Sequence, residues 1–155
     1  MIQRIQSLYL TFIIILSLLL LSGGILKFAD ESGSDINLSS AGILTDPSQK
    51  IVDQIAPAWP VTALLIMISF LSLVAVFMFR FRKIQILLTI SVIILSAVLI
   101  TAISWFGFTA IHNFRMTFSP GINMTFPVLI LIFAILGLKG IQKDDRLVRS
   151  YDRLR

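Results

Sequence analysis

Residues 84–106 have the sequence IQILLTISVIILSAVLITAISWF, which contains no charged side chain. A helix needs about 20 apolar residues to cross the hydrocarbon core of a bilayer, so this stretch is long enough to span a membrane. Three further stretches have the same character, namely residues 8–26, 59–79 and 121–138. Pro127 in the last stretch fits the first turn of a helix, where its missing N–H costs least. The sequence therefore predicts an all-α membrane protein with four transmembrane helices.

The composition agrees with this fold class. Hydrophobic residues make up 57% of the 155 residues and charged residues only 14%, whereas soluble domains carry about 25% charged residues. The apolar run at the N-terminus is longer than the core of a typical secretory signal, which favours a retained helix. We therefore expect one transmembrane domain over residues 1–138 and a separate cytoplasmic tail over residues 139–155.

The positive charges are distributed unevenly between the two sides of the predicted bundle. Ten of the thirteen Lys and Arg residues lie at the N-terminus, in the second connection or in the tail. Cytoplasmic loops carry the excess of Lys and Arg, so both termini are predicted to be cytoplasmic. The opposite side has five of the eight acidic residues, all in the long external loop 27–58. Trp59 and Trp105 fall at the outer boundary, where interfacial aromatic residues are expected.

The connections between the spans differ in length. Gly, Ser and Asp make the first half of 27–58 loop-like, and Asp46-Pro47 resembles the capped start of a short amphipathic helix. The sequence RFRK at 80–83 leaves almost no loop, so the second and third spans must form an antiparallel hairpin. The Phe-rich connection 107–120 is expected to lie in the outer interface.

Several kinds of chemistry have no support in this sequence. Cysteine is absent and there is a single histidine, which excludes disulfides, thiolate metal sites and a bis-histidine haem. The four predicted spans contain no ionisable residue, and such residues usually mark transport or proton paths. We found no zinc-protease motif, nucleotide-binding loop or catalytic triad. The basic residues flank the spans, which points to topology and not to nucleic acid. The sequence predicts neither an enzyme nor a cofactor or metal site.

Five basic residues are candidates for contact with lipid headgroups. Three belong to the second connection, where each is worth about 1 kcal/mol near anionic lipid, and two belong to the outer connection. They are Arg80, Arg82, Lys83, His112 and Arg115. For the outer two, we favour the simpler interpretation, a wetted loop with a snorkelling arginine.

The tail combines an apolar stripe with charges of both signs. In a helix Leu147, Val148, Tyr151 and Leu154 would fall on one face. Lipid binding alone favours basic residues, whereas this tail also has acids, and mixed signs suit a protein contact better. The candidate partner-binding residues are Arg146, Leu147, Val148, Arg149, Tyr151, Asp152, Arg153, Leu154 and Arg155.

Four parts of the chain carry a resemblance to a known family. They are MIQRIQS at 1–7, FRKIQI at 81–86, Phe126-Pro127, and KDDRLVRSYDRLR at 143–155. In these features the chain resembles an uncharacterised family of four-helix integral membrane proteins, a domain of unknown function typical of Bacteroidetes. The resemblance implies the inner membrane of a Gram-negative bacterium. It implies no substrate, catalytic residue or cofactor.

Two functions are compatible with these features. The first is a small accessory or scaffold subunit of the inner membrane, whose C-terminal helix recognises a larger membrane complex or a cytoplasmic protein. The second is a small transporter, channel or lipid-handling protein that acts as a homo-oligomer. We favour the first because the spans lack the intramembrane charge on which transport usually depends.

Overall fold

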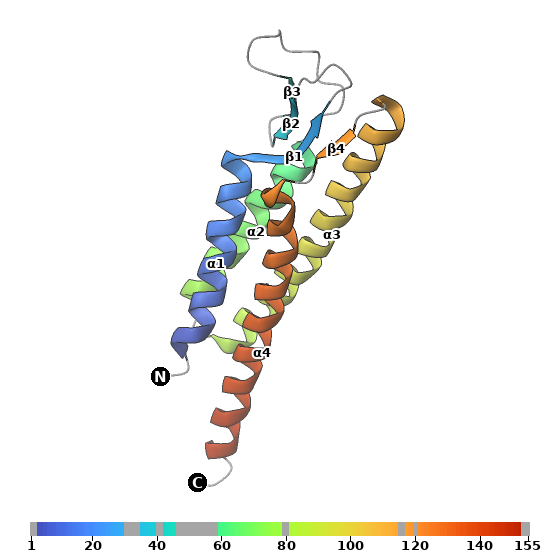
Figure 1. Ribbon diagram of the computed structural model, residues 1–155. Coiled ribbons are helices and arrows are strands. Elements are labelled where there is room, and N and C mark those ends of the chain that lie inside the picture. The colour runs from blue at the N-terminus through green and yellow to red at the C-terminus, as the bar shows by residue number, and fades with distance from the viewer. Residues whose placement is uncertain are drawn as a thin grey trace.

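Four helices form the body of the protein in the computed structural model, which describes residues 3–29, 35–39, 42–45, 59–78, 81–114, 117–119 and 121–152. Figure 1 shows the helices running side by side, with a small sheet above them. The helices are α1 (Gln3–Ser22), α2 (Trp59–Phe77), α3 (Arg82–Phe114) and α4 (Phe126–Asp152), and a single 3₁₀ turn, η1 (Ile122–Thr125), precedes α4. The predicted four-helix arrangement is confirmed.

Each helix contacts two neighbours, so that α1, α2, α3 and α4 form a closed ring in chain order. Both described ends of the chain lie at the same end of this ring, together with the α2–α3 connection (Figure 1). We call this the terminal end and the opposite one the sheet end. The core consists of aliphatic side chains from all four helices, among them Leu10, Ile13, Leu65, Leu99 and Ile130, which are completely buried.

Three of the helices are long and apolar enough to cross a membrane. They cover Trp59–Phe77, Arg82–Phe108 and Ile122–Asp145, whereas the apolar part of α1, Gln6–Ser22, is shorter. In the most apolar window of each of the three, only 28% of the residues are buried within the protein. The outward faces are also apolar, with Phe70 and Leu87 more than 60% exposed. Helices that are hydrophobic all round are typical of membrane spans, so this is a multi-pass membrane protein.

A four-stranded antiparallel sheet lies at the sheet end, and the sequence had not predicted it. Its strands are β1 (Gly24–Ala29), β2 (Asp35–Ser39), β3 (Gly42–Thr45) and β4 (Thr117–Ser119), in the order β3-β2-β1-β4. The loop interpretation of 27–58 is therefore wrong for these strands. The segments DINLS and GILT are only five and four residues long, and strand pairing decided their structure where local composition did not. The predicted cap at Asp46-Pro47 lies outside the described residues.

Pairing between β1 and β4 joins two connections that are far apart in sequence. Phe28 is opposite Phe118, and Lys27 is opposite Ser119. The connection predicted over 107–120 is also shorter in the structure. The reason is that α3 continues to Phe114 and β4 begins at Thr117. The predicted end of the third span at residue 106 marks only the end of its most apolar part.

The α4 helix also differs from its prediction. The sequence suggested a span over 121–138 and a separate tail helix, but one uninterrupted α-helix covers Phe126–Asp152. As predicted, Pro127 is in the first turn of the helix, where its ring causes no break. The span from Phe126 on and the tail up to Asp152 thus form one continuous helix.

Candidate functional site

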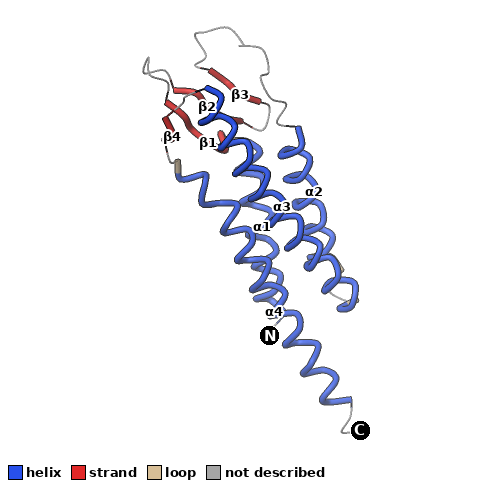
Figure 2. The backbone as a smooth tube through the Cα atoms, turned by 90° about the vertical axis from the view of Figure 1, so that its right-hand side faces the viewer, coloured by secondary structure: helices blue, strands red, loops and turns tan. Residues whose placement is uncertain are grey.

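The last part of α4 projects beyond the rest of the bundle. Figures 1 and 2 show the C-terminal turns of this helix extending past the ends of α1 and of the α2–α3 hairpin. We call residues 145–152 the stalk, and residues 139–144, which still pack against the bundle, its root. At 1.5 Å per residue the stalk extends about 12 Å.

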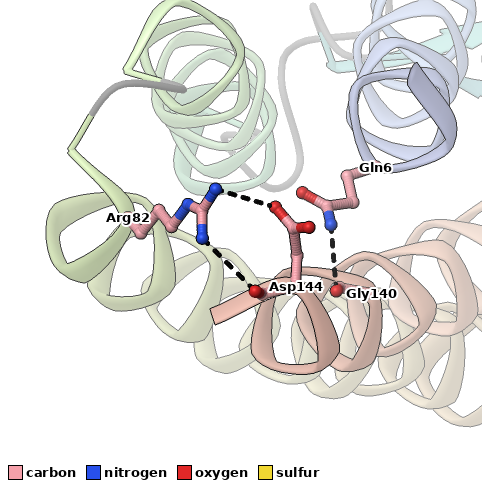
Figure 3. A network of polar contacts seen from close by, with 4 residues as sticks. All are labelled: Gln6, Arg82, Gly140 and Asp144. Carbon is pink, nitrogen blue, oxygen red and sulfur yellow. Dashed lines mark hydrogen bonds and ion pairs between the residues drawn. The ribbon is translucent and has the colours of Figure 1, made fainter. Parts of the chain in front are cut away.

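An ion pair joins the root to the beginning of α3. The Nη2 atom of Arg82 lies 3.4 Å from Oδ2 of Asp144, and Nη1 donates a hydrogen bond of 3.3 Å to the main-chain oxygen of Asp144 (Figure 3). The exposed fractions of the two side chains are 24% and 15%. One guanidinium thus holds both the carboxylate and the backbone of the same residue, which fixes the helix at this point and not only its side chain.

A second contact joins the root to α1. Nε2 of Gln6 donates a hydrogen bond of 2.9 Å to the main-chain oxygen of Gly140 (Figure 3). A Cβ atom on Gly140 would lie 3.1 Å from Cγ of Gln6, which is closer than nine in ten real contacts of a Cβ, so that Gln6 would have to move. Glycine at this position therefore lets the two helices approach closely enough for the hydrogen bond.

A buried glutamine completes the polar contacts of the terminal end. Nε2 of Gln85 donates a hydrogen bond of 3.1 Å to the main-chain oxygen of Ala75, which ties α3 to the last turn of α2. The Gln85 side chain is only 3% exposed. Because buried polar groups cost free energy unless they are paired, these contacts specify how the helices meet. All four helices are held at this end by side chain to main chain hydrogen bonds.

These contacts involve three of the four segments that resemble one family. Gln6 belongs to MIQRIQS, Arg82 and Gln85 belong to FRKIQI, and Asp144 belongs to KDDRLVRSYDRLR. A family model matches residues 2–154. The chain belongs to the DUF4293 family. The family is described as a domain of unknown function, and no curated protein or solved structure matches the chain.

The candidate partner-binding residues of this DUF4293 protein fall on the stalk and beyond it. The backbone from Arg146 to Asp152 is helical, which agrees with the helical spacing that the prediction used. Arg153, Leu154 and Arg155 lie outside the described residues, as do the side chains of 146–152.

The candidate headgroup residues are distributed over both ends of the bundle. At the terminal end Lys83 is exposed, whereas Arg82 has Asp144 as a protein partner. At the sheet end His112 is exposed and stacks on Phe108, with 6.0 Å between the ring centroids. Arg80 and Arg115 lie outside the described residues.

Sequence reasoning missed the three side chain to main chain contacts between helices at the terminal end. The available signal was an unusual residue type at a span boundary, since Gln6 and Gln85 each lie at the edge of an apolar run and Gly140 closely follows the apolar run 121–138. Within the described part of the chain, no three His, Asp or Glu side chains come together as a metal site would require. We therefore take the stalk, together with its anchored root, as the candidate functional site.

Proposed function

We propose that this DUF4293 protein is a small accessory or scaffold subunit, and that its stalk recognises a partner protein in the cytoplasm. The observation that carries the proposal is the continuity of α4 from Phe126 to Asp152. The stalk leaves the bundle in line with a membrane-spanning helix (Figure 2). An amphipathic helix that binds lipid lies in the plane of the interface, whereas a helix directed away from the bundle presents its faces to another protein.

The anchoring of the root supports the same function. Arg82 and Gln6 hold the root from two different helices, at Asp144 and Gly140. A helix fixed in one direction loses less conformational entropy when it binds than a flexible tail does. The contacts at the terminal end thus favour recognition by a preorganised helix.

We further infer that α1 is a fourth transmembrane span and that both termini are cytoplasmic. The α1 helix has 20 residues, about the length that a span needs, and it packs against two apolar helices in the ring. The excess of Lys and Arg at the terminal end favours the cytoplasm for that end. The resemblance described above favours the inner membrane of a bacterium as the location.

The proposal is tested by removing the apolar stripe of the tail. The variant Leu147→Ser, Tyr151→Ser, Leu154→Ser is purified from the native membrane in mild detergent, and co-purifying proteins are identified by mass spectrometry. We expect a stoichiometric partner of the wild-type protein to be lost, because buried apolar anchors dominate helix recognition. The four helices should stay inserted, since the changes lie outside the bundle.

A matched variant changes the charged side of the same segment, as Arg149→Ser, Asp152→Ser, Arg153→Ser. We expect this variant to keep the partner, with binding that is somewhat weaker at low salt and less sensitive to salt than that of the wild-type protein, because the charges that salt would screen have been removed. If the stripe variant keeps every partner, and a peptide of residues 143–155 binds anionic vesicles as well as the intact protein does, the tail is a membrane anchor and the proposal is wrong.

A further inference from the structure

Ser72 is an unusual residue in the interior of the bundle. Its side chain is completely buried in the second half of α2, and its hydroxyl has no hydrogen-bond partner in the described part of the chain. Other buried hydroxyls in the described bundle are paired: Ser17 with Ile14 and Ser69, Thr89 with Gln85, and Ser96 with Ile93. Leaving a buried hydroxyl unpaired lowers the stability of the fold by about 1–3 kcal/mol. We therefore expect Ser72 to have a hydrogen-bond partner.

The register of the helices places a second hydroxyl at the same level. Gln85 on α3 is bonded to Ala75 on α2, and the two helices are antiparallel. One turn further toward the sheet end, α2 therefore presents Ser72 where α3 presents Thr89, and both side chains are completely buried. Thr89 donates its hydroxyl hydrogen to the oxygen of Gln85 at 2.8 Å, which leaves its lone pairs free to accept.

The polarity of the core changes along the bundle. Toward the terminal end the buried polar side chains are Gln6, Gln85, Thr89 and Ser72. Beyond Ser96, toward the sheet end, the buried side chains of α2 and α3 are apolar: Val61, Leu99 and Ile103. Ser72 thus lies within the polar part of the core, with Gln85 on the side of the terminal end and Ser17, which is bonded to Ser69, toward the sheet end.

We propose that the bundle holds a buried water molecule that bridges Ser72 and Thr89 and that exchanges with solvent. The water accepts a hydrogen bond from the Ser72 hydroxyl and donates one to Oγ1 of Thr89. Two polar partners are the minimum for a buried water, and a bridging water is nearly as favourable in enthalpy as a direct hydrogen bond. This site lies in the membrane domain and is independent of the function proposed for the stalk.

The experiment is water-edited solid-state NMR on the full-length protein in phospholipid bilayers, with serine and threonine labelled with ¹³C. The rate at which magnetisation passes from water to each side chain reports how close a water molecule is. We expect transfer to Ser72 and Thr89 to be several-fold faster than transfer to Ser17, which is equally buried but bonded directly to Ser69 at 2.6 Å. Ser17 is thus the internal control for a dry hydroxyl.

The variant Ser72→Ala supplies a second measurement at Thr89. Removal of the Ser72 hydroxyl takes away one of the two partners of the water, so transfer to Thr89 should fall to the rate of Ser17. Equal, slow transfer to Ser72 and Ser17 in the wild-type protein would overturn the proposal. In that case Ser72 turns to a carbonyl of its own helix, as Ser69 does toward Leu65.

Discussion

Gly140 shows how one residue sets the distance between two helices. The Gln6 side chain lies against its bare Cα and reaches the main-chain oxygen beyond it. Three residues earlier on the same helix, Gly137 has a different environment, because a Cβ atom there would meet only Cβ of Tyr9, at 3.8 Å. The close contact with Gln6 thus requires glycine at position 140, whereas no close contact requires glycine at position 137. The two positions can therefore be compared by the same substitution.

The variants Gly140→Ala and Gly137→Ala should differ in stability. Alanine at 137 fits without displacement and should stabilise the helix by up to about 1 kcal/mol, the difference in helix propensity. Alanine at 140 displaces Gln6 and weakens a hydrogen bond worth about 1 kcal/mol, so this gain should be cancelled or reversed. Thermal unfolding of both variants in one detergent provides the measurement. An equal rise in melting temperature for both would show that Gln6 has another conformation of similar energy.

The structure shows a contact for Arg82 that differs from the one expected from the sequence. In the sequence it was one of three basic residues expected to contact lipid, and in the fold its guanidinium faces Asp144. The pair is partly exposed, so its Coulomb energy is screened and is worth roughly 1 kcal/mol or less. Its main effect is geometric, because it determines where the root of α4 meets α3. Lys83, the neighbouring residue, is exposed and stays a candidate for headgroup contact.

Among the elements, the sheet at the sheet end links parts of the chain that are distant in sequence. The strand β1 follows α1 directly, and β4 lies between α3 and α4. Their antiparallel pairing therefore connects these helices at the sheet end. This role could not be assigned to β4 from sequence, because an isolated three-residue strand has no pattern of its own.

The register of β1 and β4 can be tested with an engineered disulfide in this cysteine-free chain. Lys27 and Ser119 are directly opposite each other, and opposed residues of an antiparallel pair have Cα atoms about 4.5–5.5 Å apart, which a disulfide can bridge. The double variant Lys27→Cys, Ser119→Cys should oxidise readily, as measured by intact mass and by blocking of free thiols.

The matched control for this prediction is Lys27→Cys, Thr117→Cys. Thr117 is opposite Ala29 and thus two residues out of register with Lys27, so the diagonal separation is about 7–8 Å and should not allow a bridge. Efficient oxidation of the control together with failure of the first variant would mean that the strands pair in a different register.

At the scale of the whole molecule, the terminal end and the sheet end differ in charge and in structure. The terminal end has the hydrogen-bonded junction of four helices and the stalk, and the sheet end has the strands and Trp59, which is 68% exposed. In the proposed orientation the stalk is in the cytoplasm and the sheet lies on the outer side of the membrane.

Single cysteines determine this orientation. Ser119→Cys on β4 should react with an impermeant maleimide added to intact spheroplasts. Lys143→Cys, at an exposed position of the root, should react only after the membrane is opened. Labelling is measured by mass spectrometry. Reaction of the Lys143 variant in intact spheroplasts would reverse the topology inferred from the Lys and Arg count.

The sequence by itself determined the class of the protein and the approximate position of each helix. The runs of apolar residues in 59–79 and 84–106 indicate a membrane protein. Exposing so many apolar side chains to water would cost too much free energy for a soluble fold. The short hairpin connection at 80–83 likewise followed from length alone. These are local properties, and each can be evaluated within one window of the chain.

Only the tertiary structure decided the rest. The strand β4 forms because β1 lies beside it and pairs with it. Gln6 links α1 to α4 because Gly140 lies opposite it. Arg82 has a protein partner because α4 continues past residue 138 to Asp144. Each of these depends on residues that are more than 60 positions apart, and no local pattern specifies such a pair. The stalk combines both kinds of information. Its helical pattern was evident in the sequence, but its direction follows from the uninterrupted backbone of α4 and from the two helices that hold its root.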